Sequence, residues 1–125
     1  WELDFSGMPG ESHKIATERL KWSLSSQKRH HIMTGPAKDL PEDVRKHIVS
    51  VCKRVYRHLE LSGYARIDLR LRDDGRVFVM EANPNPQLAY GEDFAESAEK
   101  AGLDYGPLLD RIMALGLRWE TGRLG

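Results

Sequence analysis

The sequence predicts an α+β fold, with an antiparallel sheet that carries helices on one face. Residues 65–72 and 77–83 both alternate between polar and apolar side chains, which is the period of a strand, and an Asp-Gly step lies between them. The residues before and after this hairpin repeat apolar side chains at three- and four-residue spacings, which is the period of a helix. We therefore expect one hairpin with helices packed against its apolar side.

Three helices are expected. The first covers residues 41–61, with Gly63 just beyond its end. The second is short, covers residues 92–101 and is closed by Gly102. Asp104 is suited to cap the third helix. The apolar stripe of that third helix consists of Leu108, Leu109, Ile112, Met113 and Leu117.

The register of the hairpin decides which side chains lie opposite each other. A two-residue turn at Asp74-Gly75 places Asp68 opposite Glu81 and Arg66 opposite Asn83. A three-residue loop or a β-bulge would misalign these pairs. In the same register the other face of the hairpin is apolar, and we expect it to pack on the helices. That face consists of Ile67, Leu69, Leu71, Phe78, Met80 and Ala82.

Two carboxylates in directly opposed positions conflict with the stability of a sheet. At a separation of about 5 Å and an effective dielectric of about 20, Asp68 and Glu81 repel by roughly 3 kcal/mol before screening. A bound cation between them would remove this repulsion, and Asp, Glu and Asn oxygens suit Mg²⁺ rather than zinc. In the alternative interpretation this is a solvated face that nearby arginines neutralise. The spacing leaves both interpretations open.

Residues 63–68 (Gly-Tyr-Ala-Arg-Ile-Asp) and 80–86 (Met-Glu-Ala-Asn-Pro-Asn-Pro) resemble the C-terminal signature of ATP-grasp ligases. The D-alanine–D-alanine ligase branch is the most similar, over residues 40–113. The resemblance implies that the chain is the C-terminal portion of an ATP-grasp fold. It implies that Arg66 is catalytic and contacts the transferred phosphate. It also implies a site for two Mg²⁺ ions, or Mn²⁺, on the phosphates of ATP, with the ligands Asp68, Glu81 and Asn83.

The resemblance implies an enzyme: an ATP-dependent carboxylate–amine ligase that forms a C–N bond. Its carboxylate substrate attacks ATP to give an acyl phosphate, which an amine then captures. Gln87 stands where these ligases usually have glycine, so the carboxylate need not be D-alanine. Asn83, Pro84 and Gln87 are shared with biotin-carboxylase-type enzymes, which act on bicarbonate. A biotin-carboxylase-type enzyme and a non-catalytic binding module therefore remain as alternatives.

Residues 6–38 are expected to form a loop region over the phosphates, because the corresponding loop of the ligases brings a lysine to them. Lys28 and Arg29 are the candidate ATP-binding residues, and Lys21 is a weaker candidate. Each of these cations is equally typical of a solvated surface. The sequence therefore nominates the residues without choosing among them.

Composition excludes several classes of partner. Lys plus Arg equals Asp plus Glu at 19 each, so no global field recruits nucleic acid or a membrane. No apolar run is long enough to span a bilayer. Cys52 is the one cysteine, which is consistent with a reducing, cytoplasmic location. The expected partners are small-molecule substrates.

The whole chain, residues 1–125, is expected to be a single fragment of an ATP-grasp domain. It comprises the end of a strand (1–5), the loop region (6–38), the metal-binding hairpin with its helices (39–118) and a tail (119–125). The N-terminal domains of the same protein are then further partners. Without them we expect the fragment alone to be inactive as a ligase.

Overall fold

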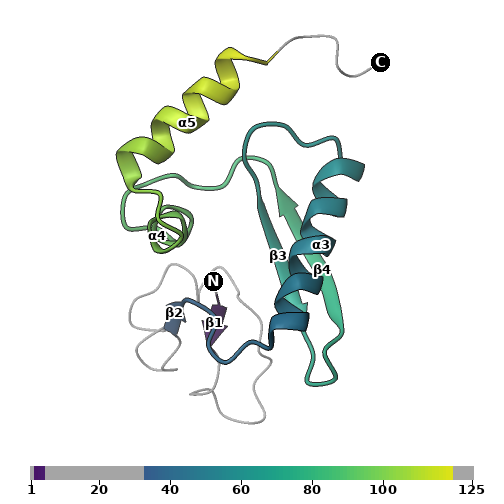
Figure 1. The fold of residues 1–125 in the computed structure, drawn as a ribbon. Helices are drawn as coiled ribbons and strands as arrows, with labels where there is room; N and C mark the ends of the chain where they lie inside the picture. The colour runs from purple at the N-terminus through teal and green to yellow at the C-terminus, as the bar shows by residue number, and fades with distance from the viewer. Residues whose placement is uncertain (1, 5–32, 120–125) are drawn as a thin grey trace. The chain divides into compact units, whose positions relative to one another are not determined.

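The computed structural model describes residues 2–4 and 33–119, and the chain divides into two compact units, residues 1–38 and 39–125. In the first unit β1 (Glu2–Asp4) pairs antiparallel with β2 (Met33–Gly35). The second unit holds a hairpin and three helices (Figure 1). These five elements are α3 (Glu42–His58), β3 (Arg66–Leu71), β4 (Val77–Asn83), α4 (Asp93–Lys100) and α5 (Tyr105–Leu117).

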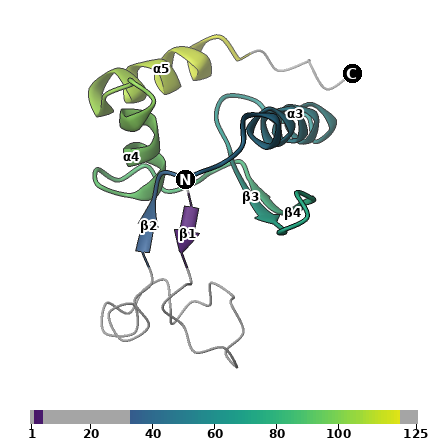
Figure 2. The same ribbon diagram turned by 60° about the horizontal axis from the view of Figure 1, so that its bottom comes forward.

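Helix α3 packs against the hairpin through its contacts with β4, and it lies alongside the strands in both ribbon views (Figures 1 and 2). An apolar stripe with three- and four-residue spacings, which includes Ile48, Val51, Cys52 and Val55, lies on this helix, and Val51 is its buried member. Cys52 is half-buried in the same stripe, and the loss of solvation raises the pKa of its thiol. Cys52 is therefore a packing residue whose thiol is protonated at neutral pH.

Helix α3 ends at His58, three residues before the expected end. The N–H of Leu61 donates to the carbonyl of Tyr56 at 3.0 Å, and the N–H of Glu60 donates to the carbonyl of Arg57 at 3.1 Å. These two bonds form a Schellman motif, which requires a left-handed residue after the cap. Glu60 takes that conformation, with φ of 53°, although it is not a glycine. Gly63 therefore lies beyond the turn that ends the helix.

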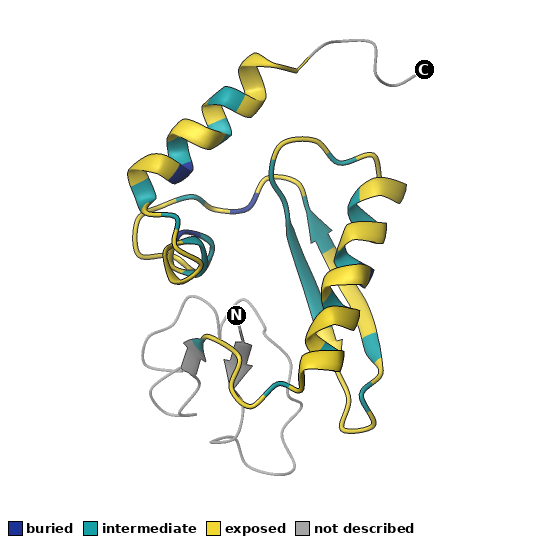
Figure 3. Ribbon diagram, in the orientation of Figure 1, coloured by how far each residue is buried: buried dark blue, intermediate teal, exposed yellow. Residues whose placement is uncertain are grey.

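Helices α4 and α5 pack against each other, and Ala95 and Leu108 are their buried residues (Figure 3). Gly102 closes α4 with a φ of 87°, as the sequence predicts. Met113 was expected in the buried stripe of α5, but 60% of its surface is exposed. Among the described residues, no helix is long and apolar enough to cross a membrane.

The turn of the hairpin is one residue longer than predicted. The N–H of Arg72 donates to the carbonyl of Arg76, and the N–H of Gly75 donates to the carbonyl of Arg72, both at 2.9 Å. Asp73, Asp74 and Gly75 thus form a three-residue loop, with Gly75 in the left-handed region at φ 80°. The predicted two-residue turn is wrong because Gly75 closes a wider loop instead.

A β-bulge in β4 restores the predicted register beyond this loop. Leu69 lies opposite Val79, but its neighbour Asp68 lies opposite Glu81, so Met80 has no partner on β3. Met80 is accordingly 68% exposed. The extra residue in the loop and the extra residue in the bulge offset each other. The half of the hairpin that carries the pairs Asp68–Glu81 and Arg66–Asn83 therefore has the expected register.

The apolar face between the loop and the bulge differs from the prediction. Leu69 and Leu71 are paired with Val79 and Val77, not with Met80 and Phe78. Phe78 lies opposite Arg70, and directly opposed residues share one face of a sheet. The one-residue shift therefore moves Phe78 to the polar face, where it is partly exposed.

Gly75→Ala tests the positive φ of the loop. We expect the free energy of unfolding to fall by about 1 kcal/mol, because a Cβ is unfavourable in the left-handed region. Gly116→Ala in α5 is the matched control, because Gly116 has open space around its Cβ position and no positive φ. This control should instead stabilise by roughly 0.5 kcal/mol. Urea denaturation measures the free energy of unfolding of both variants. Equal effects of the same sign would contradict the positive φ of Gly75 in the loop.

Candidate functional site

Four polar side chains share one face of the hairpin near its open end. Asp68 is paired directly with Glu81, and Arg66 is paired directly with Asn83. Since opposed residues share a face and residues two apart on a strand do so too, all four project to the same side. The predicted juxtaposition of these residues is confirmed. Their two strands are adjacent in the sheet, so the backbone itself fixes the arrangement.

Arg66 and Asp68 form a bidentate ion pair within this group. The guanidinium Nε donates to Asp68 Oδ1 at 2.8 Å, and an Nη donates to Asp68 Oδ2 at 3.0 Å. The side chains are 36% and 38% exposed, so solvent screens the pair only in part. These hydrogen bonds raise the pKa of Arg66 above its ordinary value despite partial desolvation. An arginine thus neutralises one carboxylate, as the solvated-face interpretation expects.

The charge around Arg66 remains unbalanced. Besides Asp68, the carboxylates of Glu81 and Asp93 also attract the guanidinium and contribute to its raised pKa. Arg70 lies on the same face, two residues further along β3, so three carboxylates face two arginines here. Sequence analysis missed Asp93, because it enters from the start of α4 and no periodicity relates it to the hairpin. The excess negative charge favours a further cation on this face.

The fourth polar residue, Asn83, is held by its own local contacts. The backbone N–H of Asn85 donates to Asn83 Oδ1 at 2.9 Å, which is an Asx turn. The hydroxyl of Tyr64 donates to Asn85 Oδ1 at 3.2 Å. Sequence analysis assigned no role to Tyr64 or Asn85. The Asn-Pro-Asn order of residues 83–85 was the signal available for the turn.

The donor atoms of this face fit Mg²⁺. Two carboxylates and one carboxamide offer hard oxygen ligands without sulfur or imidazole. Within the described ranges 2–4 and 33–119, no group of three or more His, Cys, Asp or Glu residues could hold a metal ion. The candidate set of Asp68, Glu81 and Asn83 has only two residues of these types, so that result does not bear on it. A magnesium ion that keeps several waters and binds substrate phosphates needs no more protein ligands than these.

Comparison with known proteins identifies the family of this chain. The family "D-ala D-ala ligase C-terminus" matches residues 17–114. A D-alanine–D-alanine ligase of Nitratidesulfovibrio vulgaris (strain DP4) is 38% identical over 78 residues, which is 62% of this chain and 26% of that protein. The chain belongs to the D-alanine–D-alanine ligase C-terminal family. It spans about a quarter of the length of the curated relatives it matches.

Solved structures of the ligase family confirm the fold. A Bacillus anthracis D-alanine–D-alanine ligase in complex with ATP has a TM-score of 0.61 at 34% identity, covering 64% of this chain and 28% of that one. A second structure of the Bacillus anthracis ligase has a TM-score of 0.65 at 31% identity, covering 70% and 28%. The antiparallel hairpin and the helices of this chain therefore form the C-terminal part of an ATP-grasp fold, as predicted.

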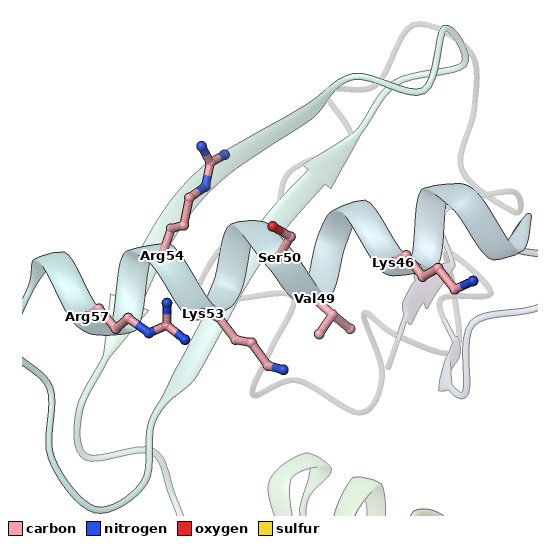
Figure 4. Close-up of a pocket in the computed structure, with 6 residues that line it drawn as sticks. All are labelled: Lys46, Val49, Ser50, Lys53, Arg54 and Arg57. Carbon is pink, nitrogen blue, oxygen red and sulfur yellow. The ribbon is translucent and has the colours of Figure 1, made fainter.

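Sequence analysis also nominated two cations as ATP-binding residues. Lys28 and Arg29 fall outside the described residues, so their contact with phosphate stays a prediction. A separate shallow pocket lies on α3 alone (Figure 4), and its side chains come from one surface of the helix. They are Lys46, Val49, Ser50, Lys53, Arg54 and Arg57. This pocket includes none of the four polar residues of the hairpin.

Glu81→Gln and Arg66→Gln should have unequal effects on stability. Removing Glu81 leaves the Arg66–Asp68 pair intact and relieves repulsion, so the free energy of unfolding should change by less than about 0.5 kcal/mol. Removing Arg66 leaves the opposed carboxylates without their cation, which should cost about 1 kcal/mol. Urea denaturation without divalent cations measures both, with Arg54→Gln on α3 as the control. A larger loss in Glu81→Gln would show that Glu81 is a structural partner.

Proposed function

We propose that this chain is the cation- and phosphate-binding part of an ATP-dependent ligase that joins a carboxylate to an amine. The observation that carries the proposal is the direct pairing of Asp68 with Glu81 beside Arg66 and Asn83 on one face. Two directly opposed carboxylates favour a cation between them, and the reaction of the family uses one. The similarity to D-alanine–D-alanine ligases supports the choice of reaction.

Asp68, Glu81 and Asn83 are the proposed ligands of two Mg²⁺ ions. The side-chain oxygens of these three residues would hold the ions on the polar face of the hairpin. Bound Mg²⁺ neutralises charge on the ATP phosphates and so assists displacement at the γ-phosphorus. Mn²⁺ accepts the same oxygen ligands and can replace Mg²⁺ in binding experiments. The neutral carboxamide of Asn83 limits the negative charge that surrounds the phosphates.

Arg66 is the proposed catalytic residue. In the reaction, an oxygen of the carboxylate substrate attacks the γ-phosphorus of ATP, and ADP leaves. The amine nitrogen then attacks the acyl carbon, phosphate leaves, and the nitrogen releases a proton. Both steps build charge on phosphate or carbonyl oxygens. The guanidinium of Arg66 is permanently charged and is oriented by two hydrogen bonds to Asp68, so it can stabilise that charge without rearranging.

The substrates are proposed to be a small carboxylate, such as an amino acid, and an amine. Gln87 is exposed and follows the buried Pro86, at the place where the ligases usually have glycine. A polar side chain here would change the contacts of the acyl group and hence the choice of carboxylate. Lys28 and Arg29 are proposed to contact the phosphates of ATP. The N-terminal domains of the protein would complete the site.

Titration with Mn²⁺ tests the proposal directly. The ion should broaden the NMR signals of the backbone amides around residues 66–68 and 81–83, because it is paramagnetic. Asp68→Asn and Glu81→Gln should each weaken binding at least tenfold, which is about 1.4 kcal/mol. Asp73→Asn is the matched control, since Asp73 lies in the loop at the opposite end of the hairpin. Its Mn²⁺ affinity should equal that of the wild type.

Arg66→Gln should have the opposite effect in the same titration. Arg66 shares the Asp68 carboxylate with any bound cation, so its removal should tighten Mn²⁺ binding several-fold. Broadening of signals spread over the whole chain, or equal binding by Asp68→Asn and the wild type, would contradict the proposed metal site. Weaker binding in Arg66→Gln would contradict the proposed sharing of Asp68.

A further inference from the structure

Two residues outside the proposed ligand set control the geometry of one ligand. Asn85 contacts Asn83 through its backbone and Tyr64 through its side chain. We propose that Tyr64 and Asn85 are positioning residues, which hold the Asn83 carboxamide with its oxygen available to a cation. This inference rests on the proposed function, because it assumes that the hairpin face binds a divalent ion. It adds residues that neither touch the ion nor belong to the hairpin strands.

The hydrogen bond from the Asn85 backbone fixes which end of the Asn83 carboxamide is available to a cation. The N–H of Asn85 can bond only to the oxygen of that group, and it does so at 2.9 Å. A carboxamide oxygen has two lone pairs, so one remains for a cation. Turning the carboxamide over would break this bond and present the NH₂ group, which cannot ligate a metal. Pro84 lies between the two asparagines and restricts the backbone of the turn through its fixed φ.

The second contact anchors the turn to the rest of the unit. Asn85 is exposed, so burial does not hold it in place. The hydroxyl of Tyr64 donates to its side-chain oxygen at 3.2 Å. The ring of Tyr64 in turn meets the ring of Phe94 of α4 edge-on, with centroids 5.6 Å apart. Tyr64 thereby links the segment before β3, the turn after β4 and helix α4.

These contacts have the form of outer-shell support for a metal ligand. Groups that orient the ligands of a metal typically change its affinity by about 10–100-fold when they are removed. Asn83 is one of three proposed ligands, and the Tyr64–Asn85 bond is exposed to solvent, so we expect a smaller effect here. Tyr64 lies two residues before Arg66 in the sequence. One short segment therefore supplies both the Arg66–Asp68 ion pair and the tyrosine that anchors Asn85.

Tyr64→Phe isolates the hydroxyl, because it keeps the ring that contacts Phe94. We expect the affinity for Mn²⁺ to fall about three- to tenfold while the urea midpoint of unfolding stays the same. Tyr56→Phe is the matched control, because the Tyr56 hydroxyl donates to the carbonyl of Gly63 at 3.1 Å and has no contact with Asn85. Its Mn²⁺ affinity should be unchanged. In the absence of Mn²⁺, the Asn85 amide should exchange its hydrogen faster in Tyr64→Phe only.

A double-mutant cycle shows whether Tyr64 acts through Asn83. In an Asn83→Ala background the Tyr64→Phe change should have no further effect on Mn²⁺ affinity, because the group it positions is gone. Additive losses would overturn the inference. Wild-type affinity in Tyr64→Phe would overturn it as well, while leaving the proposed metal site intact. Absence of Mn²⁺ binding at Asp68 and Glu81 in the wild type would instead overturn the proposed function and this inference together.

Discussion

The register of the hairpin is the constraint on which the candidate site depends. Side chains alternate between the two faces of a strand, so a shift of one residue would send Glu81 and Asn83 to the side opposite Asp68. The three-residue loop introduces such a shift, and the bulge at Met80 removes it before the strands reach the polar residues. The loop and the bulge therefore act together, and neither could be changed alone without separating the two carboxylates.

The electrostatics of the site follow from this register. Direct pairing brings Asp68 and Glu81 together, α4 adds Asp93, and Arg66 supplies one compensating charge. Arg66 and a divalent ion would be complementary in this arrangement, because three carboxylates exceed what Arg66 and Arg70 can neutralise. Arg66 is also kept rigid by the residue that it neutralises. A fixed cation beside the proposed metal site would suit the transfer of a phosphoryl group between two anionic reactants.

The sequence predicted the parts of this structure that depend on hydrophobic periodicity and on capping residues. The fold class, the three helices, the capping of α4 by Gly102 and the pairing near Asp68 are of this kind. The errors arose where the sequence allows two local choices. Asp74-Gly75 suits a two-residue turn as well as the three-residue loop. At the end of α3, Glu60 adopts the left-handed conformation, although Gly63 was the residue expected there. Asp93 and the Tyr64–Asn85 contact depend on how α4 packs, which no local pattern encodes.

The most direct measurement of the central claim is the position of Mn²⁺ in crystals of this chain, from anomalous diffraction. The account predicts a peak on the polar face of the hairpin, within coordination distance of carboxylate oxygens of both Asp68 and Glu81. A peak bound by only one of these residues, or located away from the hairpin, would contradict it. So would a structure in which the two carboxylates project from opposite faces of the sheet.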